Sequence, residues 1–205
     1  MPTNFDIKSQ RKDLYAPKRG VFGIVDVPPL NFVMVDGAGD PNVSPDYAAA
    51  IEALYTVSYG ARGIAKKELD RVHTVGPLEG LWDADDKSTF TTRDKGAWKW
   101  TMMIVQPEWI TAEIVERAIR GAVEKGVKAA YLVRFAPYVE GRSVQTLHVG
   151  SFDDEGPTLA RMHDEYIPEN GLVMTGRHHE IYLSDARRVE PAKLRTILRQ
   201  PVADA

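Results

Sequence analysis

The chain has 205 residues, 43% of them hydrophobic, which is enough to bury one sizeable core or two small modules packed together. Its formal net charge is −3, so the basic surface that nucleic-acid binding requires is not expected. Cysteine is absent, which excludes disulfides and thiolate metal sites, and no run approaches the roughly 20 apolar residues of a membrane span.

The first half of the chain predicts strands and helices in alternation. Residues 1–20 are predicted to be a polar lead-in without the apolar stretch of a secretory signal, so the protein is expected in the cytoplasm. Ser44, followed by Pro45, predicts the N-cap of a helix that runs to about Ala65. Thr111 predicts a second cap, and Gly126 the end of that helix. The other predicted elements are strands at 31–36, 72–75, 98–105 and about 131–135, and a polar loop or hairpin at 83–96.

The second half predicts a strand at 144–150, a helix from Pro157 to Asn170-Gly171, a strand within GRHHEIYLSD at 176–185 and a last strand at 194–202. In the GRHHEIYLSD stretch, a period of two places His178, Glu180 and Tyr182 on one face of the strand. His179 and Ile181 then point to the opposite face, which we expect to meet a core.

The irregular alternation of these elements predicts an α+β fold with antiparallel sheets. The two halves also share an order of events: strand, glycine-containing loop, helix, a glycine-led strand with a glutamate, and a strand ending in Gln-Pro. This repetition predicts a tandem pseudo-twofold pair of β-α-β-β modules with a ligand groove between them. In such a pair, Glu79 is the counterpart of Glu180.

Most catalytic motifs are missing from the sequence. The five histidines have no metal-ligand spacing, no G-x-S-x-G is present, and GAGD lacks the lysine and glycine spacing of a phosphate loop. Glu180 remains. In water it is a solvated strand glutamate, whereas in an aromatic groove it is a general base or the partner of a cation. His178 is expected to face solvent. The alternative is that His178, a neighbour on the same strand face, tunes the acid–base behaviour of Glu180.

Aromatic residues that could form such a groove are concentrated in the first half of the chain. All four tryptophans lie between positions 82 and 109, and Tyr55 and Tyr59 precede them. They either pack in a core or hold a flat or cationic ligand. On the strand at 98–105, Trp100 and Met103 point to opposite faces, and the sequence does not decide which face lines the groove.

Several motifs together resemble the family of GyrI-like small-molecule-binding domains, in its stand-alone bacterial branch. They are LYAP, FVMVDGAGDPN, ALY with Tyr59, PLEGLW, WKWTMMIVQP, LHVGSFDDEGPT and HHEIYLSDARR with KLRTILRQPV, and they cover nearly the whole chain. The resemblance implies a single domain over 1–205, with one module at about 21–107, a connection at about 108–140 and a second module at about 141–203. It also implies a groove between the modules with the equivalent of Glu180 at its floor.

Members of this family sense or sequester lipophilic, often cationic drugs, and some stand-alone members hydrolyse the cyclopropane ring of DNA-alkylating natural products. The resemblance therefore implies a binding protein for planar aromatic, lipophilic or cationic small molecules, with resistance to xenobiotics as its role. If it is an enzyme, it is a cofactor-independent hydrolase, and the alternative is a non-catalytic multidrug-binding protein. We expect Glu180 and Tyr182 to be catalytic, and no metal, nucleic acid or membrane to take part. The expected ligand-binding residues are Trp82, Trp100, Met103, Tyr55, Tyr59, Glu79 and His178.

Overall fold

A computed structural model describes residues 4–86, 89, 92 and 94–205. The chain divides into two compact units, the first formed by Met1–Gln10 and Leu30–Tyr138, the second by Arg11–Pro29 and Val139–Ala205. Both units combine helices with antiparallel strands, which confirms the predicted α+β class. The pseudo-twofold relation between modules stays a prediction.

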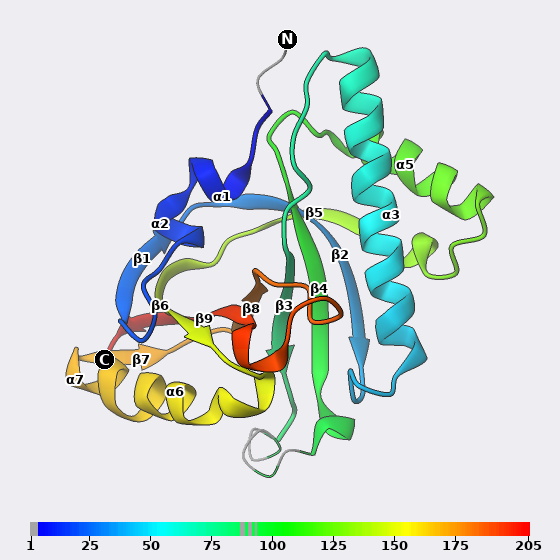
Figure 1. Cartoon of the computed structure of the whole chain (residues 1–205). Coiled ribbons are helices and arrows are strands. Elements are labelled where there is room, and N and C mark those ends of the chain that lie inside the picture. The colour runs from blue at the N-terminus through cyan, green and yellow to red at the C-terminus, as the bar shows by residue number, and fades with distance from the viewer. Residues whose placement is uncertain (1–3, 87–88, 90–91, 93) are drawn as a thin grey trace. The chain divides into compact units, whose positions relative to one another are not determined.

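The first unit is a sheet covered by a long helix. Its strands lie in the order β3 (Leu78–Asp83), β4 (Lys99–Gln106), β2 (Leu30–Ala38) and β5 (Arg134–Tyr138), all paired antiparallel. Helix α3 (Pro45–Glu68) packs on β2 and β4, and α5 (Ala112–Glu124) packs against α3 (Figure 1). The shorter elements are α1 (Ile7–Gln10), η1 (Lys95–Ala97) and η2 (Ala130–Leu132).

Both helices begin where the sequence predicts. The Ser44 side chain accepts a hydrogen bond from the backbone N–H of Tyr47, and the Thr111 side chain accepts one from that of Ile114. These bonds satisfy amides that have no partner within the first turn. Gly126 follows α5 with a φ of +78°, a left-handed conformation that glycine adopts without strain.

Three predictions in the first unit need correction. The strand predicted at 72–75 is reduced to a single bridge between His73 and Phe5, and the strand lies instead at β3. Part of the strand predicted near 131–135 is the 3₁₀ turn η2, and β5 begins at Arg134. Within the loop predicted at 83–96, the described residues 89 and 92 are helical, and 87–88, 90–91 and 93 lie outside the described residues.

The second unit has strands in the order β1 (Gly23–Val27), β6 (Gly141–Val149), β9 (Arg195–Asp204) and β8 (His178–Tyr182), again antiparallel. The short strand β7 (Leu172–Met174) also pairs with β9. A helical segment made of α6 (Gly156–Ala160), the π-helix η4 (Arg161–Tyr166) and α7 (Ile167–Glu169) leads to β7 (Figure 1). Two 3₁₀ turns, η3 (Phe152–Asp154) and η5 (Pro191–Lys193), complete the unit.

The helical segment packs on one face of this sheet. Met162 and Ile167 are buried against Val144, Leu198 and Val202, and this cluster is the core of that face. Side chains that stand directly opposite one another on antiparallel strands share a face, so Glu180 opposite Leu198 and Tyr182 opposite Thr196 lie on the helix side.

The opposite face of the second unit meets the N-terminal segment. Residues 1–20, predicted as a polar lead-in, contain α1 and α2 (Lys12–Tyr15), and Leu14 and Tyr15 of α2 are buried. This prediction was wrong because the buried apolar residues of this stretch, among them Ile7, Leu14 and Tyr15, are too few to produce a pattern among so many charges.

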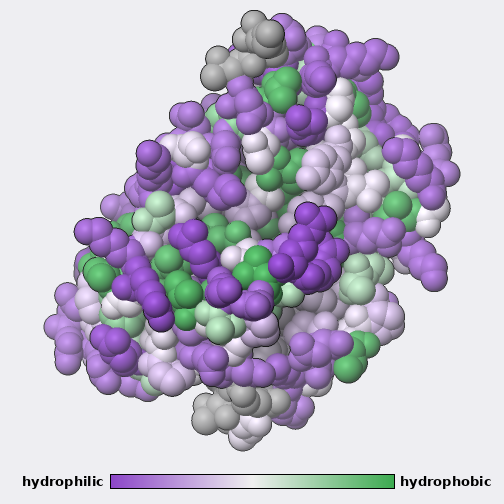
Figure 2. All heavy atoms as spheres, viewed as in Figure 1, coloured by the Kyte–Doolittle hydropathy of each residue, from purple (hydrophilic) through white to green (hydrophobic). Residues whose placement is uncertain are grey.

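The face of the molecule drawn in Figure 2 is mainly polar. Figure 2 shows hydrophilic residues over most of the visible face, with hydrophobic residues in small separate groups. Among the residues that the structure describes, no helix is both long and apolar enough to cross a membrane.

Candidate functional site

Strand β8 carries the residues on which the sequence analysis centres. His179 and Ile181 are buried on one face, and His178, Glu180 and Tyr182 alternate with them, as predicted from the period of two. The Tyr182 hydroxyl donates a hydrogen bond of 2.7 Å to Oε2 of Glu180. Since the Glu180 side chain is only 15% exposed, this carboxylate is held in place and partly removed from water.

His178 does not face solvent, which corrects the sequence-based expectation. Its side chain is 14% exposed, and its Nε2 lies 3.6 Å from Oε1 of Glu180. The ring of His163, on the π-helix η4, meets it edge-on with centroids 5.9 Å apart. Burial lowers the pKa of His178 to about 3, with further lowering from His163 and His179, so the imidazole is neutral near neutral pH. The histidine is buried because η4 covers this face of the sheet.

Glu155 is a functional candidate that the sequence analysis missed. It follows η3 and precedes α6, is 4% exposed, and its Oε1 has no hydrogen-bond partner among the residues described. Burial raises the pKa of Glu155 to about 10, and the negative charges of Glu180 and Asp153 act in the same direction, while the Thr196 hydroxyl opposes them. Glu155 is therefore protonated near neutral pH, and it interacts electrostatically with Glu180.

Two aromatic rings border this carboxyl pair. The ring of Phe152, in η3, meets the ring of Tyr182 edge-on with centroids 5.6 Å apart. Phe152 is 42% exposed, so the aromatic surface beside the carboxyls is accessible from solvent. A flat apolar molecule with a polar or cationic group suits such a surface.

A buried polar network occupies the other face of the same sheet. Oε1 of Glu140 lies 2.9 Å from Nδ1 of His179, and Oε2 of Glu140 accepts a hydrogen bond of 3.1 Å from Nη1 of Arg199. Arg199 also donates to the backbone carbonyl of Leu14 at 2.7 Å and to Gln145 at 2.9 Å. Although burial opposes it, the two positive partners lower the pKa of Glu140 to about 2. The network joins β6, β8, β9 and α2, and so fixes the strand that carries Glu180.

The predicted ligand-binding residues of the first unit separate into two faces. Trp82 and Trp100 stand opposite one another on β3 and β4, and both rings contact Tyr47 of α3, so they lie under that helix. Their exposed fractions are 6% and 2%. Met103 stands opposite Glu79 on the other face of the sheet, and both are buried. The structure thus brings Trp82 and Trp100 together and places Met103 away from them.

Tyr55 and Tyr59 form a third group on α3. Their rings are stacked with centroids 6.5 Å apart, and Tyr59 is 59% exposed. They lie outside the buried side of the helix, which is formed by residues such as Leu54, Val57 and Ala61. These two tyrosines offer an exposed aromatic surface separate from the tryptophans.

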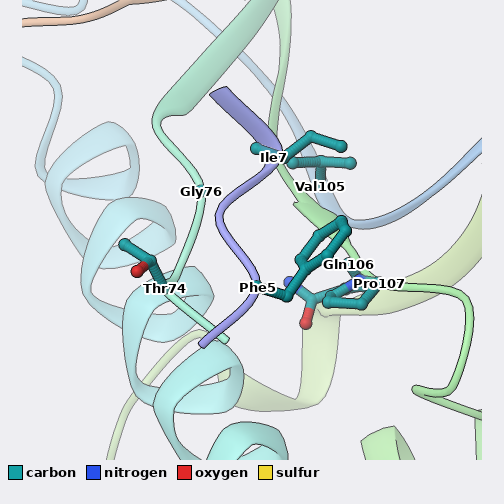
Figure 3. Close-up of a pocket in the computed structure, with 7 residues that line it drawn as sticks. All are labelled: Phe5, Ile7, Thr74, Gly76, Val105, Gln106 and Pro107. Carbon is teal, nitrogen blue, oxygen red and sulfur yellow. The ribbon is translucent and has the colours of Figure 1, made fainter. Parts of the chain in front are cut away.

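A small cavity in the first unit involves none of the predicted site residues. Figure 3 shows Phe5 beside Gln106 and Pro107, with Gly76 and Val105 along the neighbouring backbone. The cavity has room for about one water molecule, so it does not suit an aromatic ligand. We therefore place the candidate site at the carboxyl pair of the second unit.

Metal binding finds no support at this site. Within the described part of the chain, no group of three or more His, Cys, Asp or Glu side chains is arranged to hold a metal ion. The chemistry available is that of two carboxyl groups, a phenol hydroxyl and a neutral imidazole.

Comparisons with known proteins agree with the resemblance seen in the sequence. The model of the GyrI-like small molecule binding domain family matches residues 22–203. A search of curated proteins finds no match. Among solved structures, an uncharacterized conserved protein from Listeria innocua is 40% identical with a TM-score of 0.89, over 98% of this chain and all of that one.

Two further Listeria innocua structures are described as hydrolases. One is 38% identical with a TM-score of 0.85, and the other is 37% identical with a TM-score of 0.87. Each match covers 98% of this chain and 100% of the hydrolase chain.

Proposed function

Because the chain belongs to the GyrI-like small molecule binding domain family, we propose that it binds planar aromatic, lipophilic or cationic molecules and hydrolyses electrophiles that carry a strained cyclopropane ring. The observation that carries the proposal is the Glu180 carboxylate, 15% exposed and held by Tyr182 beside an accessible aromatic ring. The two similar chains described as hydrolases support the catalytic part.

The proposed reaction is attack of water on the strained ring carbon of a spirocyclopropyl-cyclohexadienone. Glu180 accepts a proton from the water as the new carbon–oxygen bond forms. The cyclopropane carbon–carbon bond breaks, and its electron pair moves into the dienone, whose oxygen becomes a phenolate. That oxygen then takes up the proton, so the net change is addition of one water. No electron donor, metal or organic cofactor takes part.

Tyr182 was expected to be catalytic, but we propose that it does not donate a hydrogen bond to the phenolate oxygen. Its single hydroxyl proton is engaged with Glu180 at 2.7 Å, so it orients the base. Tyr182 is therefore proposed as a residue that positions Glu180. Of the three tyrosines proposed from the sequence as donors to the phenolate oxygen, Tyr182, Tyr55 and Tyr59, the last two are to be tested by substitution.

The alternative function is binding without catalysis. The same carboxylate then serves as the counter-charge of a lipophilic cation, with aromatic rings stacked on the ligand. The Glu180 carboxyl group, 15% exposed beside an accessible aromatic ring, favours this alternative for cationic ligands.

Mass spectrometry of a spirocyclopropyl-dienone compound, incubated with wild type and with Glu180→Gln, separates the two functions. A water adduct formed by wild type and reduced roughly 100-fold or more in the variant supports a hydrolase with Glu180 as its base. Glu190→Gln is the matched control, because Glu190 is an exposed glutamate of the same unit that forms an exposed ion pair with Lys193. An unchanged compound with wild type, together with tight binding of a rhodamine-type cation, contradicts the catalytic part.

A further inference from the structure

We propose that His178 is a second residue that positions Glu180: its imidazole directs Nε2–H at Oε1 of Glu180, so that Tyr182 and His178 hold the carboxyl group at both oxygens. This inference rests on the proposed function and adds to it the orientation of the base and the tautomer of the histidine.

The first argument is the geometry on one face of β8. Residues two apart on a strand point to the same side, with their Cα atoms about 7 Å apart. Glu180 lies between its two neighbours on this face. Its Oε2 accepts the hydrogen bond of 2.7 Å from the Tyr182 hydroxyl, and its Oε1 lies 3.6 Å from Nε2 of His178. Each carboxyl oxygen thus faces a different neighbour on the same strand.

The second argument is what the imidazole requires. In the part of the chain that the structure describes, neither ring nitrogen of His178 has a partner that meets hydrogen-bond geometry. A buried N–H without an acceptor is costly, and a bare lone pair on Nε2 would repel Oε1 of the ionised base. The ring hydrogen therefore belongs on Nε2. The separation of 3.6 Å is longer than a formed hydrogen bond, and contacts of this kind often shorten when a ligand binds.

Gln200 on β9 is the competing acceptor. Its side chain also interacts with the ring of His178. Because its Nε2 donates to the backbone carbonyl of Thr175 at 2.8 Å, its side-chain oxygen is the atom that competes with Oε1 of Glu180 for the ring hydrogen. The experiment must therefore separate the two acceptors.

His163 supports the ring from the helical segment. It lies in the π-helix η4, and its ring meets that of His178 edge-on with centroids 5.9 Å apart. π-Helical turns are rare and occur frequently at functional sites. Burial lowers the pKa of both imidazoles, so the ring of His178 orients the base without adding a positive charge beside it.

A base held at both oxygens has one fixed orientation. Each carboxylate oxygen has about two lone pairs, so the two donors leave one on each oxygen for the attacking water. The remaining lone pairs then keep a constant direction toward the ligand. Loss of one donor lets the carboxylate rotate, which lowers the rate of the chemical step more than the affinity for the substrate.

Two-bond proton–nitrogen NMR of isotope-labelled protein near neutral pH measures the tautomer directly. The signal of His178 is assigned by its loss in His178→Gln. We expect a hydrogen on Nε2 and a bare Nδ1. Glu180→Gln should shift this Nε2–H signal, and Gln200→Met should shift it less, because Glu180 is the acceptor.

Two substitutions of His178 test the effect on hydrolysis of the spirocyclopropyl-dienone compound. Leucine removes the donor, whereas glutamine keeps an N–H near the place of Nε2. We expect His178→Leu to lower kcat roughly 10–100-fold with KM changed by less than about twofold, and His178→Gln to stay within about threefold of wild type. His73→Leu makes the same change at a buried histidine of the first unit, and it should keep the wild-type kcat.

The possible results have distinct meanings. A hydrogen on Nδ1 overturns the inference, and so does an Nε2–H signal that shifts in Gln200→Met but not in Glu180→Gln. Equal losses of kcat in His178→Leu and His178→Gln, with urea midpoints equal to that of wild type, also overturn it, because the donor then has no effect. If wild type forms no water adduct, the catalytic part of the proposed function is wrong, and the NMR result alone decides whether His178 holds Glu180.

Discussion

Replacing Glu140 with glutamine removes a buried negative charge from a network that ties three strands to the N-terminal segment. Glu140 is 2% exposed and contacts His179 at 2.9 Å and Arg199 at 3.1 Å. In the variant, Arg199 stays buried with its positive charge and without a counter-charge. An uncompensated buried charge is among the most destabilising changes that a single substitution produces.

The size of the effect follows from the pKa of Glu140. Its lowering from 4.5 to about 2 corresponds, at 1.36 kcal/mol for each pH unit, to about 3 kcal/mol of stability. Because the folded-state pKa lies below the unfolded one, this contribution is complete above pH 4.5 and is lost as the pH falls toward about 2. The uncompensated charge of Arg199 adds to the loss. We therefore expect Glu140→Gln to lower the free energy of unfolding by about 3–5 kcal/mol near neutral pH.

Urea unfolding followed by tryptophan fluorescence measures this loss, with Asp185→Asn as the matched control. Asp185 has a pKa lowered to about 2 as well, through hydrogen bonds from Arg187, but it lies at the surface. Its replacement should cost below about 1 kcal/mol, as solvent-exposed ion pairs contribute little. A loss below about 1 kcal/mol in Glu140→Gln, or equal losses in the two variants, would refute the assignment of the effect to buried charge.

Three further substitutions test other parts of the structure. Gly37→Ala should destabilise the first unit by about 1–3 kcal/mol and change tryptophan fluorescence, because the added Cβ would overlap the indole ring of Trp100. A stability equal to that of wild type would show that the ring does not lie there. Gly63→Ala, on α3 with open space around its Cβ position, should instead raise the free energy of unfolding by about 0.4–1 kcal/mol, and a loss would contradict the open space. Burial, and secondly the charge of Arg62, lowers the pKa of His73 to about 4, so neutral His73 stabilises the fold above pH 6.5 and this contribution is lost as the pH falls toward about 4. In His73→Gln, the free energy of unfolding should fall less steeply than in wild type over that pH range, as unfolding curves would measure. A pH dependence equal to that of wild type would contradict this role of His73.

Local signals in the sequence predicted the starts of both long helices and the alternation of β8. Ser44 and Thr111 cap their helices through bonds to amides three residues away, so the whole interaction lies within one turn. The burial of His179 and Ile181 follows from strand geometry, because neighbouring residues of a strand face opposite sides. Features of this kind can be predicted from a few consecutive residues.

The position of β3 could not be predicted in the same way. Both 72–75 and PLEGLW contain apolar residues bounded by turn-forming ones, so their local patterns are equivalent. Pairing decides between them: Glu79 to Asp83 find partners along β4, whereas His73 has only a single bridge to Phe5. A strand forms where a neighbouring backbone satisfies its amides and carbonyls, and that neighbour is remote in the sequence.

The candidate site shows the same division between local and remote causes. Glu180 could be selected because its strand pattern places it beside His178 and Tyr182. Glu155 could not, since SFDDEGP is typical of an exposed acidic segment before a helix, where carboxylates favour the helix dipole. Its burial arises because the helical segment of α6, η4 and α7 packs on the face that β6 and β9 form, and η4 also covers His178. Met162 and Ile167, the apolar residues that hold this segment on the sheet, do not ionise, yet their packing contributes to the burial that raises the pKa of Glu155.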